Sequence, residues 1–297
     1  MKKIMKTITI FTPTYNRKKN LKKLYSSLLN QKQKDNFTWL IVDDGSTDGT
    51  KKLIDELLLE DKIDIKYFYQ KNSGKQIAHN LGVEKANTDL FICVDSDDYL
   101  LPEATEIIEK CLDDEDEKVA GWIFMRGNLD GNPIGTQLTK RMMTNVKKLT
   151  ELYEKYSFKG DTALVFKTDI LKKYKFDTVN NEKFIGEDYL YRKLEQDYDL
   201  VPRNKIFYIT EYQSDGYTKN VLKHITSSPG NYLLLKRISI ETSNRLMYKF
   251  KHAILFDAMA IYMDNYKVIF KDSYIYMKVL AIPLGYVYYF MKFRRLK

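Results

Sequence analysis

The 297-residue sequence has few cysteines, few histidines and no long apolar run near its start. Its two cysteines, Cys93 and Cys111, are too few for a disulfide framework, and Cys93 lies in an apolar run, where a buried free thiol is the usual interpretation. A reducing compartment is therefore expected. The N-terminus begins like a signal peptide, but its apolar run covers only 7–11 before Pro13 stops it. This run is too short for a secretory segment, so it predicts a first strand and no secretion.

Positive charge is unevenly distributed along the chain. Hydrophobic residues make up 44% and charged residues 30%, which is typical of a globular protein. Residues 219–297 contain 14 Lys/Arg and 4 Asp/Glu, whereas residues 1–218 contain 35 and 36, so the tail carries all of the net charge of +9. A basic tail suits nucleic acid or an anionic membrane surface. Because aromatic and aliphatic residues separate its charges, we expect a membrane contact and no nucleic-acid partner.

The first half of the chain alternates short β-rich runs with helical patterns. Strands are predicted at 6–12, 37–42, 63–69 and 89–94, with helices between them and after them. This alternation predicts an α/β fold with a doubly wound parallel sheet, in which ligands bind at the carboxyl ends of the strands. Further strands are predicted at 119–127, 161–168 and 205–212, with a hairpin at 128–135 and a helix at 186–197.

Beyond about residue 217 the pattern is helical and basic. Its most apolar stretch, 273–293, approaches the roughly 20 residues of a membrane-spanning helix. It also contains Lys278, Pro283 and many aromatic residues, which favour a helix lying in a membrane interface. A packed helix and a spanning helix remain the alternatives.

Four polar motifs follow the first four predicted strands. They are TPTYNR at 12–17, VDDGSTDGT at 42–50, NSGKQIAHN at 72–80 and VDSDD at 94–98. In the first, Tyr15 can stack on a nucleobase. In the second, a carboxylate can accept an N–H from the base. In both cases the alternative is a plain turn that caps the next helix.

The third and fourth motifs suit a diphosphate and a metal. Gly74, Lys75 and a helix N-terminus can hold phosphate, although a lone lysine at a helix start is usually solvated. Asp95 and Asp97 follow a buried strand on one side of an extended segment, where a hard divalent cation would find oxygen ligands. An acidic loop is the alternative for this motif alone, but its three companions at neighbouring strand ends favour a metal site.

In this order and at these intervals, the motifs resemble the nucleotide-sugar-binding half of bacterial family 2 glycosyltransferases with the GT-A fold. The resemblance is close over 5–110 and looser to about 215. It implies a GT-A catalytic domain at 1–216, with a donor half at 1–110 and an acceptor half at 111–216. A helical, basic region at 217–297 would then contact a membrane or another copy of the chain.

The resemblance also implies residue roles. Tyr15 and Asp44 would hold the base, usually uracil, and Lys75 would approach the nucleotide. Asp97 would be the main ligand of Mn²⁺ or Mg²⁺ with Asp95 beside it, and Asp98 is an alternative ligand. The predicted nucleotide-sugar-binding residues are Pro13, Tyr15, Arg17, Asp43, Asp44, Lys75, Asp95 and Ser96.

A catalytic carboxylate is implied by the motif IGEDYLYRKL at 185–194. Asp188 is the predicted general base, with Glu187 second; the alternative is that acids are simply favoured at a helix N-terminus. His224 is a weaker candidate metal ligand, because some family members use a late histidine, and a surface histidine is the preferred interpretation.

These features predict an inverting hexosyl- or N-acetylhexosaminyltransferase. It would move a sugar from a UDP-sugar to a hydroxyl of a glycan or lipid-linked saccharide, in the cytoplasm at the inner face of the cell membrane. A sugar nucleotidyltransferase is one alternative, but it would usually carry a glycine-rich segment after the first strand, which 12–17 lacks. A non-catalytic GT-A-like binding protein is the other, but Lys75, Asp97 and Asp188 are all present.

Overall fold

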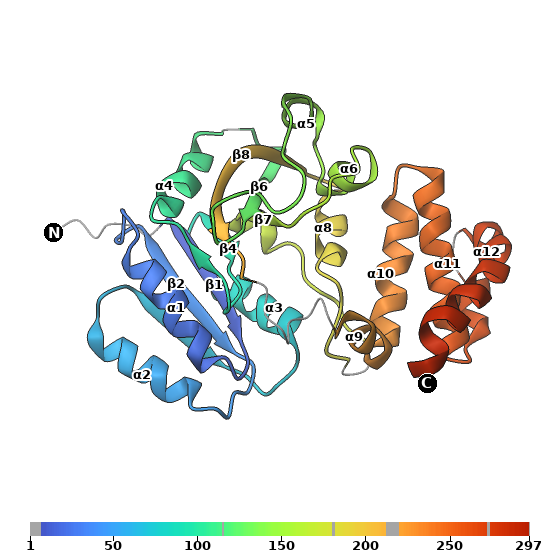
Figure 1. Cartoon of the computed structure of the whole chain (residues 1–297), viewed down its shortest axis with the longest axis horizontal. Helices are drawn as coiled ribbons and strands as arrows, with labels where there is room; N and C mark the ends of the chain where they lie inside the picture. Colours follow the sequence, from blue (N-terminus) through green and yellow to red (C-terminus); the bar gives the residue numbers. More distant parts are fainter. Residues whose placement is uncertain (1–6, 115, 180–181, 212–219, 272–273, 297) are drawn as a thin grey trace. The chain divides into compact units, whose positions relative to one another are not determined.

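The computed structural model describes residues 7–114, 116–179, 182–211, 220–271 and 274–296, and these form two compact units (Figure 1). The first, here called the sheet unit, comprises Met1–Lys175 and Asp197–Gln213. The second, here called the helical unit, comprises Phe176–Gln196 and Ser214–Lys297. Each unit is described by itself.

In the described residues of the sheet unit, eight strands form one mixed sheet in the order β3-β2-β1-β4-β7-β6-β8-β5. Strands β1 to β4 run parallel, β7 is antiparallel to both β4 and β6, β8 is parallel to β6, and β5 is antiparallel to β8. The strands are β1 Ile8–Thr14, β2 Phe37–Asp43, β3 Ile65–Tyr69, β4 Leu90–Cys93, β5 Tyr99–Leu100, β6 Val119–Gly127, β7 Thr162–Lys167 and β8 Asp199–Ile209.

Helices cover both faces of this sheet. Helix α1 (Lys18–Leu29) buries Leu21, Leu24 and Leu28 in a core that it shares with α2 (Thr50–Glu60) and the sheet. On the opposite face lies α3 (Lys75–Lys85), where the His79 ring meets the stacked pair Phe11 and Phe91 edge-on. The shorter helices are α4 Ala104–Glu109, η1 Lys110–Asp113, α5 Lys140–Asn145, α6 Leu149–Glu154 and α7 Thr168–Leu171.

The predicted α/β fold is confirmed, with differences in detail. β8 begins at Asp199, not at 205, because the charged, proline-containing stretch before 205 still pairs with β6 across register shifts. Helix α3, predicted as a capped helix at 72–86, begins at Lys75, since Gly74 has a φ of 99° that a helix does not allow. Strand β5 and helices α5 and α6 were not predicted. The predicted hairpin forms a tight turn, in which the amide of Gly131 donates to the Asn128 carbonyl at 2.9 Å.

The helical unit has its own core, formed by residues such as Tyr232, Phe256, Met259 and Phe293. Its elements are α8 Asp188–Leu194, α9 Val221–Ser227, α10 Pro229–Thr242, α11 Leu246–Tyr262, η3 Tyr266–Phe270, α12 Ile275–Tyr288, η4 Tyr289–Phe293 and η5 Arg294–Leu296. The helical character predicted for the tail is confirmed. None of the helices in the described part of the chain combines the length and apolarity that a membrane crossing requires.

Residues 176–196 pack in the helical unit, although they precede the predicted domain boundary at 216. The Glu182 carboxylate accepts hydrogen bonds from the amides of Gly230 at 2.9 Å and Asn231 at 2.6 Å, at the start of α10. The buried Asn231 side chain donates in return to the carbonyls of Glu182 and Phe184. These bonds hold the segment that carries α8 against α10. The functional division at residue 216 stays a prediction.

Candidate active site

The four polar motifs meet at one edge of the sheet. Thr14 at the end of β1 is in register with Asp43 at the end of β2, and Asp43 is in register with Tyr69 at the end of β3. Phe11 of β1 aligns with Cys93, the last residue of β4. Because these strands are parallel, the loops that follow them emerge on the same side, as predicted.

The loops after β1 and β2 are tied together by Asn16, which has a φ of 52°. Its amide donates to the Ser46 hydroxyl at 2.8 Å, and its side-chain oxygen accepts from the Thr47 amide at 2.8 Å. The neighbouring Tyr15 side chain is 50% exposed. Pro13 is buried within β1, so of these two motif residues only Tyr15 presents its ring for stacking.

Asp43 and Asp44 are both buried, and both organise loops. The Asp43 carboxylate accepts from the Ser46 amide at 2.7 Å and from the Tyr67 hydroxyl at 2.8 Å. Burial and this bond to Asp43 raise the pKa of the Tyr67 phenol above its ordinary value.

Asp44 accepts from three donors, through Oδ1 from the Gln70 side chain and the Ser73 amide and through Oδ2 from the Gly74 amide at 2.8 Å. Since each carboxylate oxygen has two lone pairs, Oδ2 keeps acceptor capacity for a base N–H. The three bonds also hold the turn that places Lys75 at the start of α3.

An ion-pair network follows β4. Lys75 Nζ lies 2.6 Å from Asp95 Oδ1, and Arg126 Nη1 lies 3.6 Å from Asp95 Oδ2. Burial raises the pKa of Asp95, but the attraction of Lys75 and Arg126 outweighs burial and leaves the pKa below its ordinary value. Asp95 is therefore an ionised carboxylate that already has two cationic partners.

Asp98 is buried and surrounded by donors. Its carboxylate accepts from Arg126 at 3.2 Å, the Tyr208 hydroxyl at 2.7 Å, the Thr210 hydroxyl at 3.4 Å and the Glu211 amide at 3.2 Å. Burial and the charge of Asp95 raise the pKa of Asp98 to about 7. These bonds fasten Asp98 to β8 and occupy most of its acceptor sites.

Asp97 differs from its neighbours. Its carboxylate is half-buried, and the hydrogen bond that bears on its pKa comes from its own backbone amide rather than from another residue in the described part of the chain. Burial and then the charge of Asp95 raise its pKa, while Arg17 and Lys75 oppose that change. Asp97 is thus the carboxylate of this motif that is best suited to a cation, and Ser96 beside it is buried.

The described residues contain no group of three or more His, Cys, Asp or Glu placed to hold a metal by themselves. Mg²⁺ is commonly bound through one or two carboxylates together with substrate phosphates and water. The residues present fit a cation of that kind, which takes most of its ligands from a bound diphosphate.

Two residues of this site, Arg126 and Tyr208, were not predicted. The Arg126 guanidinium lies over the Tyr208 ring at 4.1 Å, and its Nε donates to the Thr162 carbonyl. The Tyr208 hydroxyl accepts from the Asp95 amide at 3.0 Å and donates to Asp98. Both residues lie near the carboxyl ends of β6 and β8, which run parallel to each other. The sequence places Arg126 at the end of the predicted strand 119–127, but it does not give the direction of that strand in the sheet.

The predicted base lies in the helical unit. Asp188 is the first residue of α8; its side chain is 47% exposed and lies 3.7 Å from Arg192 Nε. Burial lowers the pKa of the nearby Lys236, and Asp188 opposes that shift. Burial, followed by Lys236 and Arg192, lowers the pKa of His252 to about 2. Asp188 therefore stands beside a basic cluster formed by Arg192, Lys236 and the neutral His252.

Glu187 and His224 also belong to the helical unit. Glu187 immediately precedes α8 and is half-buried, and His224 lies on α9 with its ring 5.4 Å from that of Phe184. Burial and Lys223 lower the pKa of His224. The roles of Asp188 and Glu187 in catalysis and of His224 in metal binding stay predictions.

Comparison with known proteins places these residues in a known context. The family model of Glycosyl transferase family 2 matches residues 9–175. Over 296 residues, covering 95% of this chain and 90% of the relative, the sequence is 28% identical to a GalNAc(5)-diNAcBac-PP-undecaprenol beta-1,3-glucosyltransferase of Campylobacter jejuni.

Two solved structures share the fold. S. aureus TarS 1-349 in complex with UDP-GlcNAc matches with a TM-score of 0.61 and 16% identity, covering 98% of this chain and 92% of TarS. Against a longer TarS chain the match covers 43% of that chain. The mannosyltransferase PcManGT of Pyrobaculum calidifontis, in complex with GDP-Man and Mn2+, matches with a TM-score of 0.56 and 13% identity, covering 96% of this chain and 87% of PcManGT. These likenesses confirm the predicted GT-A fold.

Proposed function

The chain belongs to glycosyltransferase family 2, and from that premise we propose that it is an inverting enzyme that moves a sugar from a UDP-sugar to an acceptor hydroxyl. The transferred group would be a hexosyl or N-acetylhexosaminyl unit. The observation that carries the proposal is the edge of the sheet unit where Lys75 and Arg126 pair with Asp95, while the Asp97 carboxylate accepts from no other residue in the described part of the chain.

The donor would bind through the loops after β1 to β4. Tyr15 would stack on the base and Asp44 Oδ2 would accept a base N–H, while Pro13 and Asp43 shape their loops. Lys75 would approach the diphosphate, as would Arg17, whose charge reaches Asp97. The UDP-GlcNAc and UDP bound in the two TarS complexes support a uridine donor. The GDP-Man bound in PcManGT makes a guanosine donor the alternative to test.

Asp97, with Asp95 beside it, would hold Mn²⁺ or Mg²⁺. The cation would offset the negative charge that develops on the departing diphosphate. The Mn²⁺ of the PcManGT complex supports this assignment. The four donors that surround Asp98 favour Asp97 over Asp98 as the ligand. His224 stays a weaker candidate.

Asp188 would act as general base, with Glu187 as second choice. It would take the proton of the acceptor hydroxyl as the oxygen attacks the anomeric carbon from the side opposite the diphosphate. Attack from that side inverts the configuration, so an α-linked donor gives a β-linked product. Lys75 would stabilise the charge on the leaving UDP.

The acceptor would be a glycan or a lipid-linked saccharide. The name of the Campylobacter relative, whose substrate is linked to undecaprenol through PP, supports a lipid-linked acceptor. The enzyme would then work in the cytoplasm at the inner face of the cell membrane, with the helical unit making a peripheral contact. Association with a second copy is the alternative role for that region.

The test is a panel of UDP- and GDP-sugars, scored by thermal shift and by release of nucleoside diphosphate with and without Mn²⁺. We expect a UDP-sugar to raise the melting temperature in a metal-dependent way and to be hydrolysed slowly to UDP. If no nucleoside diphosphate stabilises the protein with metal present, the proposal is wrong. Release of pyrophosphate from a nucleoside triphosphate would point instead to a nucleotidyltransferase.

A further inference from the structure

Helix α12 buries its charged and small residues and exposes its large apolar ones, which is the reverse of what a helix on a water-facing surface does. It buries Lys278, Ala281 and Gly285, and Lys278 is only 1% exposed although it is the one charged residue of the helix. Tyr276 is 84% exposed and Leu280 is 72% exposed. The other large side chains that α12 exposes are Val279, Leu284, Tyr286 and Val287. The exposed face of α12 therefore carries no charge.

Close contacts fix this orientation. A Cβ at Gly285 would lie 2.8 Å from the Asp257 Cβ, so only glycine allows α12 to approach α11 this closely. Lys278 Nζ donates to the Lys271 carbonyl at 2.7 Å and lies 4.9 Å from the centre of the Phe256 ring. Rotating α12 to bury its large side chains would break these contacts.

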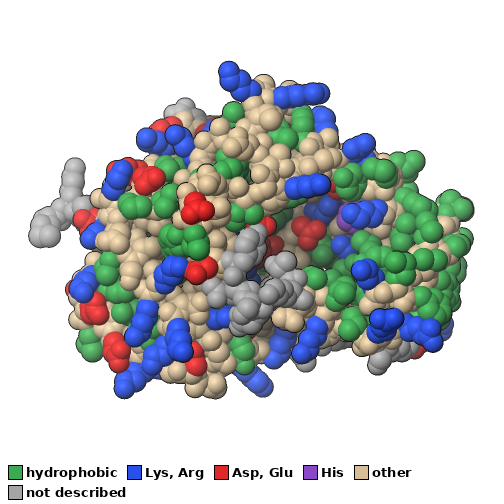
Figure 2. Space-filling model, viewed as in Figure 1, with side chains coloured by type: hydrophobic (Ala, Val, Ile, Leu, Met, Phe, Trp, Pro, Cys, Tyr) green, Lys and Arg blue, Asp and Glu red, His purple; other side chains and the backbone are tan. Residues whose placement is uncertain are grey.

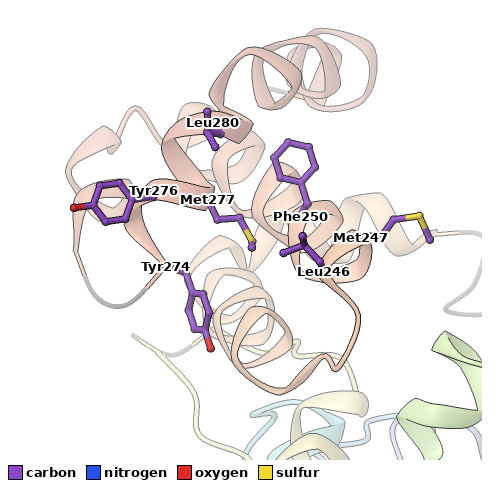
Figure 3. Close-up of a pocket in the computed structure, with 7 residues that line it drawn as sticks. All are labelled: Leu246, Met247, Phe250, Tyr274, Tyr276, Met277 and Leu280. Atoms are coloured by element: carbon purple, nitrogen blue, oxygen red, sulfur yellow. The ribbon is translucent and has the colours of Figure 1, made fainter.

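The apolar face continues as a groove between α11 and α12, with a volume of about 690 Å³ (Figure 3). Met277 of α12 lies opposite Leu246 and Phe250 of α11 in this view. The lining residues are Leu246, Met247, Phe250, Tyr274, Tyr276, Met277 and Leu280. Every one of them is apolar or aromatic. The groove thus suits a hydrocarbon chain rather than a polar ligand.

Basic side chains are frequent in the segment that forms this face and in the residues that follow α12. Between residues 245 and 297 the sequence has ten Lys/Arg and three Asp/Glu, and one of the three, Asp257, is buried. Lys249 Nζ lies 3.2 Å from the Tyr274 hydroxyl, and the Arg294 guanidinium lies 5.1 Å from the Phe290 ring. Figure 2 shows hydrophobic side chains gathered over the C-terminal helices, with Lys and Arg beside them.

The positive charge of these side chains favours an anionic bilayer over a second copy of the chain as the partner of this face. A symmetric contact with a second copy would bring two sets of basic side chains together, and their repulsion would oppose it. An anionic bilayer offers phosphates for the basic side chains and acyl chains for the apolar ones. Tyrosines at the edge of an apolar face are also typical of membrane interfaces.

We propose that the α11–α12 face, defined by Leu246, Met247, Tyr274, Tyr276, Leu280 and Leu284, is a docking surface for an anionic lipid bilayer and that its groove takes one hydrocarbon chain of a lipid. α12 lies in the plane of the membrane and does not cross it. The inference rests on the proposed function only for the source of the acceptor; the docking itself needs no glycosyl transfer.

Vesicle flotation of the full chain tests the apolar part of the face. One arm uses phosphatidylcholine vesicles, and the other uses phosphatidylcholine with phosphatidylglycerol. The double variant Tyr276→Glu/Leu280→Glu should weaken partitioning about a hundredfold, because two large side chains can no longer enter the lipid. The matched control is Leu59→Glu on α2, where the side chain is 87% exposed in the sheet unit, and it should float like the wild type.

A second variant set tests the charge. Lys292→Gln/Arg294→Gln/Arg295→Gln should weaken binding to the anionic vesicles about a hundredfold, at roughly fivefold for each lost charge, and leave binding to phosphatidylcholine unchanged. Its control replaces three exposed lysines of the sheet unit, Lys19, Lys22 and Lys52, by Gln. Circular dichroism confirms that each variant is folded.

The proposal is overturned if the wild type floats with neither vesicle, or if the controls lose binding as much as the α12 variants. It is also overturned if light scattering shows a dimer that Tyr276→Glu/Leu280→Glu dissociates, because a second copy then covers the face. Hydrolysis of UDP-sugars without vesicles is measured on the same proteins. If the protein floats with vesicles but does not hydrolyse UDP-sugars, the proposed function is wrong and the docking surface is supported. If it hydrolyses UDP-sugars but does not float, the docking surface is wrong and the proposed function is supported.

Discussion

The two units handle buried charge in opposite ways. In the sheet unit, the carboxylates of Asp95 and Asp98 are surrounded by cations and donors, so their charges are compensated before any ligand arrives. In the helical unit, neither carboxylate oxygen of the buried Asp257 has a hydrogen-bond partner among the described residues, and the buried Lys236 has no carboxylate within ion-pair distance there. Helix α12 also differs from helix α1 of the sheet unit, since α1 buries leucines in the core whereas α12 exposes Leu280 and Leu284.

This contrast separates two tasks. A preformed network of charges holds Asp97 and Lys75 in place for a diphosphate and spares the site a reorganisation on binding. The helical unit instead exposes an apolar face and buries Asp257 without a hydrogen-bond partner among the described residues, and both features cost stability in water. We therefore expect substitutions in the sheet unit to change donor binding, and substitutions in the helical unit to change acceptor chemistry, membrane binding or stability.

The largest expected effect is at Asp188, and it tests whether the helical unit serves acceptor chemistry without affecting donor binding. Asp188→Asn should lower the rate constant of transfer about a thousandfold, which is the range for loss of a general base, and leave UDP affinity unchanged. The measurement is kcat for transfer together with UDP binding by calorimetry. Glu187→Gln is the matched control and should retain most of the activity. Loss of UDP binding in Asp188→Asn would remove Asp188 from the role of base.

A second comparison sharpens the roles of the tandem carboxylates. Asp97→Asn should weaken metal-dependent UDP-sugar binding by about ten- to a hundredfold, the value of a lost charge-assisted contact, with little change in melting temperature. Asp98→Asn should instead lower the free energy of unfolding by about 1–3 kcal/mol, because Arg126 and the buried Tyr208 hydroxyl lose a carboxylate acceptor. Titration with Mn²⁺ and thermal melts separate the two outcomes. If Asp98→Asn weakens metal-dependent binding and Asp97→Asn lowers stability, Asp98 is the metal ligand.

The sequence predicted much of the sheet unit because its signals are local. Each motif directly follows a strand, and parallel strands bring their carboxyl ends to one edge, so Tyr15, Asp44 and Lys75 could be placed without coordinates. Arg126 could not, because it depends on topology. β7 runs antiparallel between β4 and β6, and this makes β6 parallel to β4 and brings Arg126 to the site.

The helical unit was less predictable for a physical reason. Residues 273–293 showed an apolar pattern, but a helix that is apolar almost all round does not reveal which face it buries. Lys278 would be expected to point to water, yet it is buried between Phe256 and the Lys271 carbonyl. Its orientation is set by the close approach at Gly285, which is a property of the packed pair of helices.

A smaller effect concerns the uncompensated Asp257. Burial raises its pKa from 3.8 to about 7, and Lys278 opposes that rise. The folded protein therefore holds an extra proton between these two values, so stability should fall as the pH rises from about 4 to 7. Asp257→Asn should reduce this slope, to which Asp98 also contributes, and raise the free energy of unfolding at pH 8 by about 2 kcal/mol. Urea melts at several pH values measure it, with the exposed Asp264→Asn as control; an unchanged slope in Asp257→Asn would contradict the assignment.

The smallest expected effect tests whether the exposed ring of Tyr15 in the sheet unit binds a ligand, as we propose for the exposed tyrosine rings of α12. Tyr15→Ala should weaken UDP binding about five- to tenfold, the lower range for loss of a base stacked on an aromatic side chain, without a change in melting temperature. Tyr15→Phe should bind like the wild type, because stacking needs the ring and not the hydroxyl. The control is Tyr69→Ala, which removes another exposed tyrosine from the end of β3. Calorimetry with UDP measures all three variants. If Tyr15→Ala and Tyr69→Ala behave alike, the exposure of Tyr15 reflects only its loop, and the base must be held by Asp44 and its neighbours.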